Sequence, residues 1–491
     1  MGNASCLGNW HGCASRRAAE LRSVGVVTIA PAQLPRTVGA LRAAGYAPKS
    51  VKAEIADNLL SRLRAGDQVW PGIVGFDDTV LPQLERALLA RHDLVLLGER
   101  GQGKTRLLRT LAGLLDEWTP VIDGSELGEH PLAPIAPESV RRARELGDEL
   151  PVNWRHREER YTEKLATPDT SVGDLIGDVD PVKVAEGRSL GDPETIHFGL
   201  VPRAHRGIVA INELPDLAER IQVALLNVME ERDIQVRGYP LRLPLDVLLV
   251  ATANPEDYTN RGRIITPLKD RFGAEIQTHY PLDVAAEAAL VRQEAELVAE
   301  VGTPLVEVLA RFVRELREAP VIDQRSGVSA RFAVAAAETV AAAALRRSAL
   351  TGETEAVARP IDLESVPEAL RGKLEFESGE QGREQEHLGY FLRRAFAETA
   401  RDKLAGLDLR PLIEVVADGN LVATGERVAA GELLRALPEL PVLHEVAARL
   451  GVNSSDPDGR IAAAVEFALE SLYLRRKLAK DTEGGTSVYG P

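Results

Sequence analysis

The chain has 491 residues, of which 44% are hydrophobic, 27% charged and 4% aromatic, so we expect a globular protein of about two to four domains with aliphatic cores. Its formal net charge of −15 argues against a protein that binds nucleic acid or an anionic membrane through overall charge. There is no apolar leader, no apolar run of about 18 residues and only two cysteines, which predicts a cytoplasmic protein without a membrane partner, a zinc site or a disulfide framework.

The N-terminal part of the chain predicts helices before the first strand. Residues 1–35 show weak periodicity, and a helix is predicted over 50–63. Its apolar residues recur at helical intervals and predict one buried side, made of Val51, Ile55, Leu59, Leu60 and Leu63. Further along, we expect a helix over 81–90, a buried strand over 93–97 and a helix over 105–115.

The middle of the chain alternates strands with helices. A polar, proline-containing stretch over 123–169 is long for a loop and predicts an inserted subdomain. It is followed by a buried strand over 207–214, a helix over 217–231, a β-hairpin over 234–243 and a buried strand over 246–253. This alternation predicts an α/β fold built on a parallel sheet.

After residue 281 the sequence becomes rich in alanine and helical in pattern. Helices are predicted over 285–301, 304–317, 329–345 and 383–404, and the remainder is expected to be mostly helical. We therefore expect a partly flexible N-terminal extension with one helix over 1–67, an α/β core with inserts over 68–281, a helical lid over 282–400 and a helical C-terminal region over 401–491.

The strongest chemical signal is a glycine-rich loop between the strand over 93–97 and the helix over 105–115. It fits the pattern GxxxxGK[ST] in full and consists of Gly98, Glu99, Arg100, Gly101, Gln102, Gly103, Lys104 and Thr105. Glycines let backbone N–H groups close around phosphates. We expect Lys104 to hold the β- and γ-phosphate oxygens of ATP and the Thr105 hydroxyl to ligate Mg²⁺.

A second signal is the apolar strand over 207–214, which contains Asn212 and Glu213 near its end. An aspartate usually stands at the first of these positions, where it anchors Mg²⁺ through water, and the glutamate orients the attacking water. The amide oxygen of Asn212 still accepts a hydrogen bond from metal-bound water, but it carries no charge. We expect Glu213 to act on water and Asn212 to give weaker Mg²⁺ binding.

Three further residues are candidates for acting on or sensing the nucleotide. Asn254 follows the strand over 246–253 and is predicted to sense the γ-phosphate, the alternative being a turn residue before Pro255. Arg271, in Leu-Lys-Asp-Arg-Phe, is predicted to reach the γ-phosphate of a neighbouring subunit, which implies a ring. Arg331, which opens a helix after Gly327, is a candidate second sensor. For both arginines the alternative is a solvated residue at a helix end.

These motifs, in this order, resemble those of AAA+ ATPases of the helix-2-insert group, nearest to magnesium chelatase I subunits and MoxR-type ATPases. The resemblance spans residues 72–331. Ile73 and Val74 resemble the segment next to adenine, residues 178–198 fall where the helix-2 insert lies, and residues 230–243 resemble the pre-sensor-1 hairpin. The resemblance implies a P-loop AAA+ parallel-sheet core followed by an α-helical lid and a mostly helical C-terminal region.

The resemblance also implies a hexameric ring that hydrolyses ATP with Mg²⁺ and remodels or activates a client through a partner with a von Willebrand A-type domain. We identify no porphyrin-specific feature in the sequence and expect a chaperone-like motor rather than a pigment enzyme. A bacterial enhancer-binding activator is a further relative, but its Gly-Ala-Phe-Thr-Gly-Ala loop is absent.

Two other functions stay open. Because Asn212 replaces an aspartate, the protein is alternatively an ATP-dependent binding switch with little hydrolysis. A nucleic-acid motor would use Arg232, Arg237 and Arg242 of the hairpin as pore residues, but the acidic net charge argues against nucleic acid as a partner.

Overall fold

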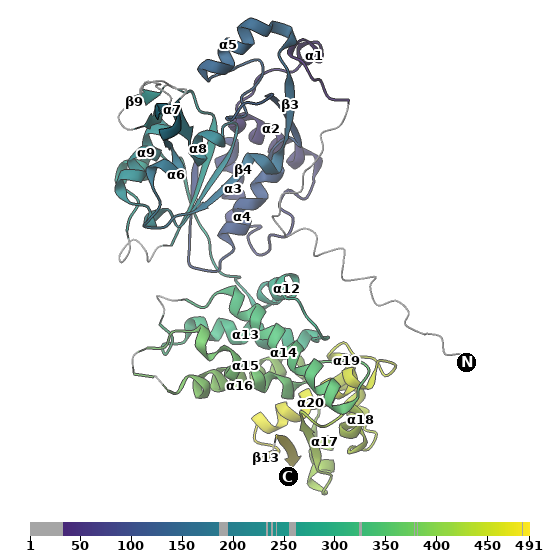
Figure 1. Ribbon diagram of the computed structural model, residues 1–491. Coiled ribbons are helices and arrows are strands. Elements are labelled where there is room, and N and C mark those ends of the chain that lie inside the picture. Colours follow the sequence, from purple (N-terminus) through teal and green to yellow (C-terminus); the bar gives the residue numbers. More distant parts are fainter. Residues whose placement is uncertain are drawn as a thin grey trace, which may run out of the picture.

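The computed structural model describes residues 33–185, 195–231, 234–236, 239–241, 243–254, 262–323, 327–377, 379–380, 382–483 and 485–491. The predictions for residues 1–32 and for Arg232, Arg237 and Arg242 lie outside these ranges. Figure 1 shows an α/β part followed along the chain by a mostly helical part. Within the described ranges, no helix combines the length and the apolar character needed to cross a bilayer.

A parallel sheet forms the centre of the α/β part, as the sequence predicts. In the described residues its strand order is β11-β1-β10-β7-β4, and every neighbouring pair is parallel. The strands are β1 (Leu94–Leu97), β4 (Tyr161–Leu165), β7 (Gly207–Asn212), β10 (Val247–Ala253) and β11 (Ala274–Gln277). Leu97 lies opposite Ala253, and Ala251 lies opposite Ile211, so β1, β10 and β7 end at the same edge of the sheet.

Helices cover both faces of this sheet (Figure 1). Successive strand residues point to opposite faces, so Val95 and Val209 enter one core, whereas Leu94 and Leu96 enter the other. The first core is covered by α6 (Val172–Leu175), α8 (Leu200–Arg203) and α9 (Glu219–Glu230), and the second by α2 (Val51–Ala65), α3 (Val80–Leu89) and α4 (Lys104–Thr110). Burial on both faces explains why β1, β7 and β10 are continuous apolar runs in the sequence.

Two helices near the N-terminus differ in detail from the prediction. In α2, Val51, Ile55 and Leu59 are buried, but Leu60 and Leu63 are 36% and 39% exposed, so the buried face is narrower than expected. Consecutive helix residues are rotated by about 100°, which turns Leu60 away from the core that Leu59 enters. The helix predicted over 105–115 is α4 followed by a 3₁₀ turn, η2 (Leu111–Leu114).

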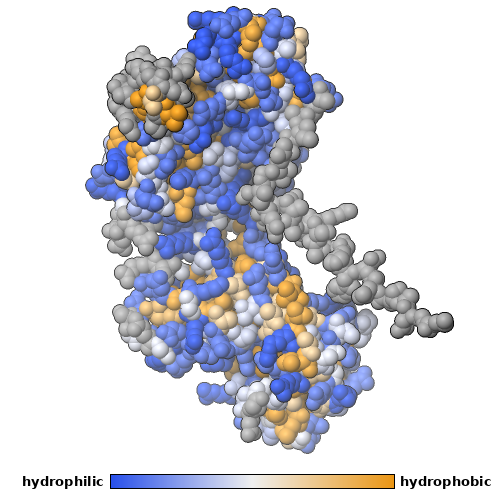
Figure 2. All heavy atoms as spheres, in the orientation of Figure 1, coloured by the Kyte–Doolittle hydropathy of each residue, from blue (hydrophilic) through white to orange (hydrophobic). Residues whose placement is uncertain are grey.

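The stretch predicted as an inserted subdomain contributes a strand to the central sheet. An antiparallel pair, β2 (Trp118–Ile122) and β3 (Val152–His156), packs with α1 (Val38–Ala43), and α5 (Pro137–Leu146) lies between the two strands in the chain. Figure 2 shows hydrophilic surface at the end of the molecule that holds α5. The next strand, β4, pairs with β7 instead. The sequence did not reveal β4 because Tyr-Thr-Glu-Lys-Leu contains no apolar run and none of its residues is fully buried.

The expected hairpin is present, with β8 (Ile234–Val236) antiparallel to β9 (Tyr239–Leu241). The segment predicted as the helix-2 insert contains most of the antiparallel pair β5 (Gly177–Val179) and β6 (Ile196–Phe198) and the helix α7 (Pro181–Ala185), and its residues 186–194 lie outside the described part. The other short elements are η3 (Gly147–Glu149), η4 (Arg157–Arg160), η6 (Leu214–Asp216) and α11 (Thr266–Arg271).

The part of the chain after residue 281 is mostly helical and shares one hydrophobic core, which runs from Ala288 to Tyr489. It therefore continues across the boundary predicted at residue 400, and that boundary stays a prediction. The helices are α12 (Val284–Glu294), α13 (Thr303–Glu318), α14 (Ala330–Thr351), η7 (Pro360–Glu364), α15 (Ser365–Leu370), η8 (Arg371–Lys373), α16 (Glu384–Lys403), α17 (Arg410–Ala417), α18 (Ala430–Arg435), α19 (Pro441–Arg449) and α20 (Asp458–Leu474).

The C-terminal region contains a small sheet that the sequence does not predict. Strands β12 (Val422–Gly425), β14 (Thr486–Gly490) and β13 (Ala479–Glu483) pair antiparallel in that order. These strands are short and mix apolar residues with polar ones. Their sequences therefore show no clear apolar alternation. The helix predicted over 285–301 also ends early, at Glu294, and Glu300 forms an isolated parallel bridge to Val357.

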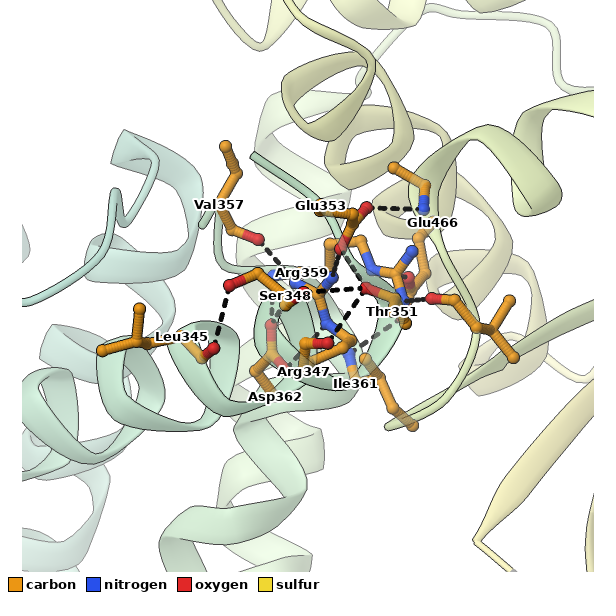
Figure 3. Close-up of polar contacts among 12 residues, drawn as sticks. Leu345, Arg347, Ser348, Thr351, Glu353, Val357, Arg359, Ile361, Asp362 and Glu466 are labelled. Atoms are coloured by element: carbon orange, nitrogen blue, oxygen red, sulfur yellow. Dashed lines mark hydrogen bonds and ion pairs between the residues drawn. The ribbon is translucent and has the colours of Figure 1, made fainter. Parts of the chain in front are cut away.

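Buried charges connect α14 to α20 (Figure 3). Arg359 and Glu466 are both fully buried, with Nε and Oε2 3.3 Å apart, and Arg347 forms ion pairs with Asp362 at 3.0 Å and Glu353 at 2.9 Å. Burial raises the pKa of Glu466, and the nearby Arg359 opposes this rise. Such a cluster makes each member costly to remove, because its partner then stays buried without an opposite charge.

We expect Glu466→Ala to lower the free energy of unfolding by about 3–5 kcal/mol, because it leaves the Arg359 guanidinium buried without its carboxylate. Glu426→Ala is a matched control, since Glu426 pairs with Arg346 but both side chains are more than 60% exposed. This substitution should lower the free energy of unfolding by less than about 1 kcal/mol. Urea denaturation followed by circular dichroism measures both values, and equal losses would contradict the structural role of the buried pair.

Candidate nucleotide-binding site

The predicted site residues meet at the edge of the sheet where β1, β10 and β7 end. Gly98 follows β1, Asn254 follows β10, and Asn212 is the last residue of β7. Because these strands are neighbours and parallel, their carboxyl ends bring the three residues together although they are far apart in the sequence.

The glycine-rich loop is closely packed at two glycines and open at a third. A Cβ atom at Gly98 would overlap Thr278 Oγ1 and Gln102 Oε1, and one at Gly101 would lie 2.9 Å from Ser329 Cα. In contrast, a Cβ atom at Gly103, the residue before α4, would meet no atom within 4 Å. The loop is thus fixed against the protein on one side and leaves space next to the start of α4 on the other.

The ammonium group of Lys104 holds the ends of two strands together. Lys104 is buried, and its Nζ donates to the carbonyl oxygens of Gly98 and of Glu99 (2.8 Å) and to Asn254 Oδ1 (2.8 Å). Asn254 Nδ2 in turn donates to Glu213 Oε2 at 2.9 Å. Asn254 therefore bridges the lysine of the loop and the glutamate that follows β7.

Glu213 has an unusual backbone conformation for its residue type. Its φ of 57° lies in the left-handed region, and its backbone N–H donates to Thr252 Oγ1 at 3.0 Å. A left-handed conformation costs a residue with a Cβ roughly 1–2 kcal/mol. The surrounding contacts offset this cost, and the carboxylate of Glu213 reaches Asn254.

Asn212 lies beside Thr105 with its amide oxygen toward the loop. Thr105 Oγ1 donates to Asn212 Oδ1 at 3.4 Å, and Thr252 Oγ1 donates to the same oxygen at 3.3 Å. Asn212 Nδ2 donates to Glu163 Oε1 at 2.8 Å. The sequence does not point to Glu163 or Thr252, since neither belongs to a motif and Glu163 lies in the unpredicted strand β4.

The donor set near Thr105 fits Mg²⁺ better than a metal that needs an all-protein cage. In the described residues no group of three or more histidine, cysteine, aspartate or glutamate side chains is arranged to hold a metal ion. Mg²⁺ is usually bound by one or two protein groups together with phosphate oxygens and water. The Thr105 hydroxyl and the Asn212 amide oxygen are groups of this kind.

The segment of Ile73 and Val74 lies next to α4 and α12. The carbonyl oxygen of Gly72 accepts a hydrogen bond from Gln293 Nε2 at 2.7 Å, and a Cβ atom at Gly72 would lie 2.9 Å from Arg106 Nη2. Ile73 itself is half-buried against the core that contains α4. The structure thus places this segment near the glycine-rich loop, and its contact with adenine stays a prediction.

The helical part reaches the loop directly through Ser329, and Tyr280 connects the loop to Arg317 of the helical part. Ser329, the residue before α14, packs on Gly101, and Tyr280 donates its hydroxyl to the carbonyl oxygen of Arg100 at 2.8 Å. The guanidinium carbon of Arg317, in α13, lies 4.0 Å from the centre of the Tyr280 ring. Burial, with Glu99 nearby, raises the pKa of Tyr280.

The structure places the two predicted arginines differently. Arg331 is in the first turn of α14, two residues after Ser329, and is exposed. Arg271 ends α11 and forms an ion pair with Glu230 at the end of α9, with both side chains about half exposed. Arg271 is therefore on the surface and is not part of the Lys104–Asn254–Glu213 group of its own chain.

Known proteins are similar to limited stretches of the chain. A family model described as the sigma-54 interaction domain matches residues 187–271. The magnesium-chelatase subunit ChlI of Anabaena variabilis is 28% identical over 206 residues, which are 41% of this chain and 57% of that protein. The 38 kDa magnesium-chelatase subunit of Rhodobacter capsulatus is 28% identical over 237 residues, which are 46% of this chain and 59% of that protein. These matches show that the chain is similar to AAA+ ATPases of the magnesium-chelatase type.

The chain spans just over half the length of the magnesium-chelatase subunits that it matches. A solved complex of subunits BchI and BchD of magnesium chelatase is 22% identical, with coverage of 65% of this chain and 98% of that chain and a TM-score of 0.35. The matches to magnesium-chelatase subunits confirm the resemblance inferred from the motifs, and the parallel sheet confirms the α/β fold class.

The packing of Gly101 gives a direct stability test of the contact between the loop and the helical part. Gly101 and Gly103 both have a left-handed φ, of 76° and 78°. Alanine should therefore strain both positions alike, but at Gly101 it also overlaps Ser329. We expect Gly101→Ala to lower stability by about 1–3 kcal/mol more than Gly103→Ala, measured by thermal and urea unfolding without nucleotide. Equal losses would show that Ser329 does not pack on the loop.

Proposed function

We propose that this chain is a Mg²⁺-dependent ATPase that converts ATP and water to ADP and phosphate. The observation that carries this proposal is the continuous set of contacts from Lys104 through Asn254 to Glu213, with Thr105 and Asn212 beside it. These groups provide a cation for phosphate oxygens, a metal-binding hydroxyl and a carboxylate for water within one small region. The match to the AAA+ family supports the same activity.

Each residue has a role that follows from its chemistry. Lys104 binds the β- and γ-phosphate oxygens, and its present oxygen partners keep its ammonium group at the loop. Bound Mg²⁺ would neutralise phosphate charge, and the Thr105 hydroxyl and Asn212 amide oxygen would hold it. Glu213 orients the attacking water and accepts its proton, while Asn254 keeps the Glu213 carboxylate near the γ-phosphate.

We further propose that the chain works as a ring, with Arg271 acting on the nucleotide of the neighbouring subunit. The half-exposed position of Arg271, away from its own Lys104, supports this role. A hexamer, a partner with a von Willebrand A-type domain and a cytoplasmic setting complete the proposal. ATP turnover would then be coupled to remodelling or activation of the partner, through the contacts of Ser329 and Tyr280 with the loop.

An ATP-dependent binding switch is the second candidate function. The neutral Asn212 at the Mg²⁺ position favours it, because a missing negative charge weakens metal binding and slows hydrolysis. Steady-state turnover separates the two functions. A nucleic-acid motor has less support, since the net charge of −15 opposes binding to phosphate backbones.

Phosphate release from ATP tests the ATPase proposal. Lys104→Ala should abolish turnover because it removes the phosphate-binding cation, and Glu213→Gln should lower it by about 10²–10⁴-fold while ATP binding is kept. Lys49→Ala is the control, since Lys49 is half-exposed and pairs with the half-exposed Asp57 of α2. ATP binding without turnover in the unaltered protein would instead favour the switch.

A mixing experiment tests the action of Arg271 between subunits. Lys104→Ala and Arg271→Ala proteins should each be inactive alone, because one lacks the phosphate-binding cation and the other lacks the arginine supplied to its neighbour. When mixed, an intact loop in one subunit meets an intact Arg271 from the next, and phosphate release should reappear. A mixture as inactive as its components, in a verified mixed oligomer, would exclude this role.

A further inference from the structure

The side-chain amide of Asn212 is held from both ends. Its oxygen accepts from Thr105 and Thr252, and its nitrogen donates to Glu163 Oε1 at 2.8 Å. We propose that Glu163 is a positioning residue that turns the Asn212 oxygen toward the Mg²⁺ position and polarises the Asn212 amide. This inference rests on the proposed function, because it concerns how the same site binds Mg²⁺.

The chemistry of the two side chains fixes the direction of the amide. An amide has one accepting end and one donating end, whereas an ionised carboxylate only accepts. With Glu163 on one side, the nitrogen of Asn212 must face it, and the oxygen then faces Thr105. A reversed amide would place its oxygen against the carboxylate and its nitrogen beside the metal, and both arrangements are repulsive.

The fold holds Glu163 in this place. Strand β4 pairs with β7 in parallel, with Glu163 opposite Ala210 and Leu165 opposite Asn212. Glu163 is therefore a diagonal neighbour of Asn212 on the same face of the sheet, which is within reach of a long side chain. This arrangement depends on β4 being part of the central sheet.

Arg109 fixes the carboxylate of Glu163 from the other side. Arg109 Nε and Nη2 donate to the two carboxylate oxygens at 2.8 and 3.0 Å, and this contact raises the pKa of Arg109. Arg109 and Thr105 are one turn apart on α4. Contacts thus run from Arg109 through Glu163 and Asn212 back to Thr105. The first and last residues of this series both lie on one turn of α4.

A carboxylate that accepts from the amide nitrogen also affects the amide oxygen. It draws positive charge to the nitrogen end and increases the negative partial charge on Oδ1, which faces the metal. Outer partners of metal ligands commonly change metal affinity by about 10–100-fold when they are removed. The alternative is that Glu163 only forms an ion pair with Arg109, which predicts no effect on Mg²⁺.

The Mg²⁺ concentration needed for nucleotide binding tests the proposal. The full chain is titrated with MgCl₂ at a fixed concentration of a fluorescent, non-hydrolysable ATP analogue, mant-AMP-PNP, and binding is also measured in EDTA. We expect Glu163→Ala to raise the half-maximal Mg²⁺ concentration about tenfold and to leave binding in EDTA unchanged. Glu163→Gln keeps an oxygen that accepts from Asn212, so it should raise this concentration less than Glu163→Ala does.

A double substitution distinguishes a positioning role from a purely structural one. Asn212→Asp alone places two carboxylates side by side, so it should gain little Mg²⁺ affinity. Adding Glu163→Gln supplies an amide N–H to the new carboxylate and should lower the half-maximal Mg²⁺ concentration several-fold. The same Glu163→Gln change would thus weaken Mg²⁺ binding beside asparagine and strengthen it beside aspartate, an opposite sign that loss of folding cannot produce.

A control variant at the opposite edge of the sheet shows whether the effect on Mg²⁺ binding is specific to Glu163. Glu275→Gln removes a carboxylate from the opposite edge strand β11, where Glu275 pairs with Lys269 at 3.0 Å, and should leave the Mg²⁺ dependence unaltered. Unchanged Mg²⁺ dependence in both Glu163 variants, or the same effect of Glu163→Gln in both backgrounds, would overturn the proposal while the ATPase assignment stands. If the unaltered protein binds no nucleotide with or without Mg²⁺, the proposed function and this inference both fail.

Discussion

The candidate site depends on the hydrogen bonds of the Lys104 ammonium group. This group is buried and binds the carbonyl oxygens at the start of the glycine-rich loop and the amide of Asn254 at the end of the neighbouring strand. Asn254 then reaches Glu213 after β7. Only a parallel sheet with β10 between β1 and β7 brings these groups to one edge, so the strand order determines the chemistry.

Two further sets of contacts join at this edge. Arg109 and Thr105 of α4 enclose Glu163 and Asn212, which connects the outer strand β4 to the loop. On the other side, Ser329 and Tyr280 connect the loop to the helical part. The loop therefore contacts both the edge of the sheet and the helical part, so nucleotide bound at the loop is close to the contacts with both.

The sequence predicted the parts of the site that use strong local signals. Continuous apolar runs revealed β1, β7 and β10, and the loop pattern located Lys104 and Thr105 between strand and helix. Strand β4 was missed because it is polar and half-exposed at the edge of the sheet, and with it the role of Glu163. The contacts of Ser329 and Tyr280 join residues far apart in sequence, and no local pattern indicates such pairs. The strands of the small C-terminal sheet were also not predicted, because their polar residues leave no clear apolar alternation.

Isothermal titration of ATP into the purified chain tests the central claim most directly. The account predicts one ATP per chain in the presence of Mg²⁺, weaker binding in EDTA, and loss of binding in Lys104→Ala. Binding that is equally strong in Lys104→Ala, or no binding of ATP by the folded, unaltered protein, would contradict a nucleotide site at the ends of β1, β10 and β7.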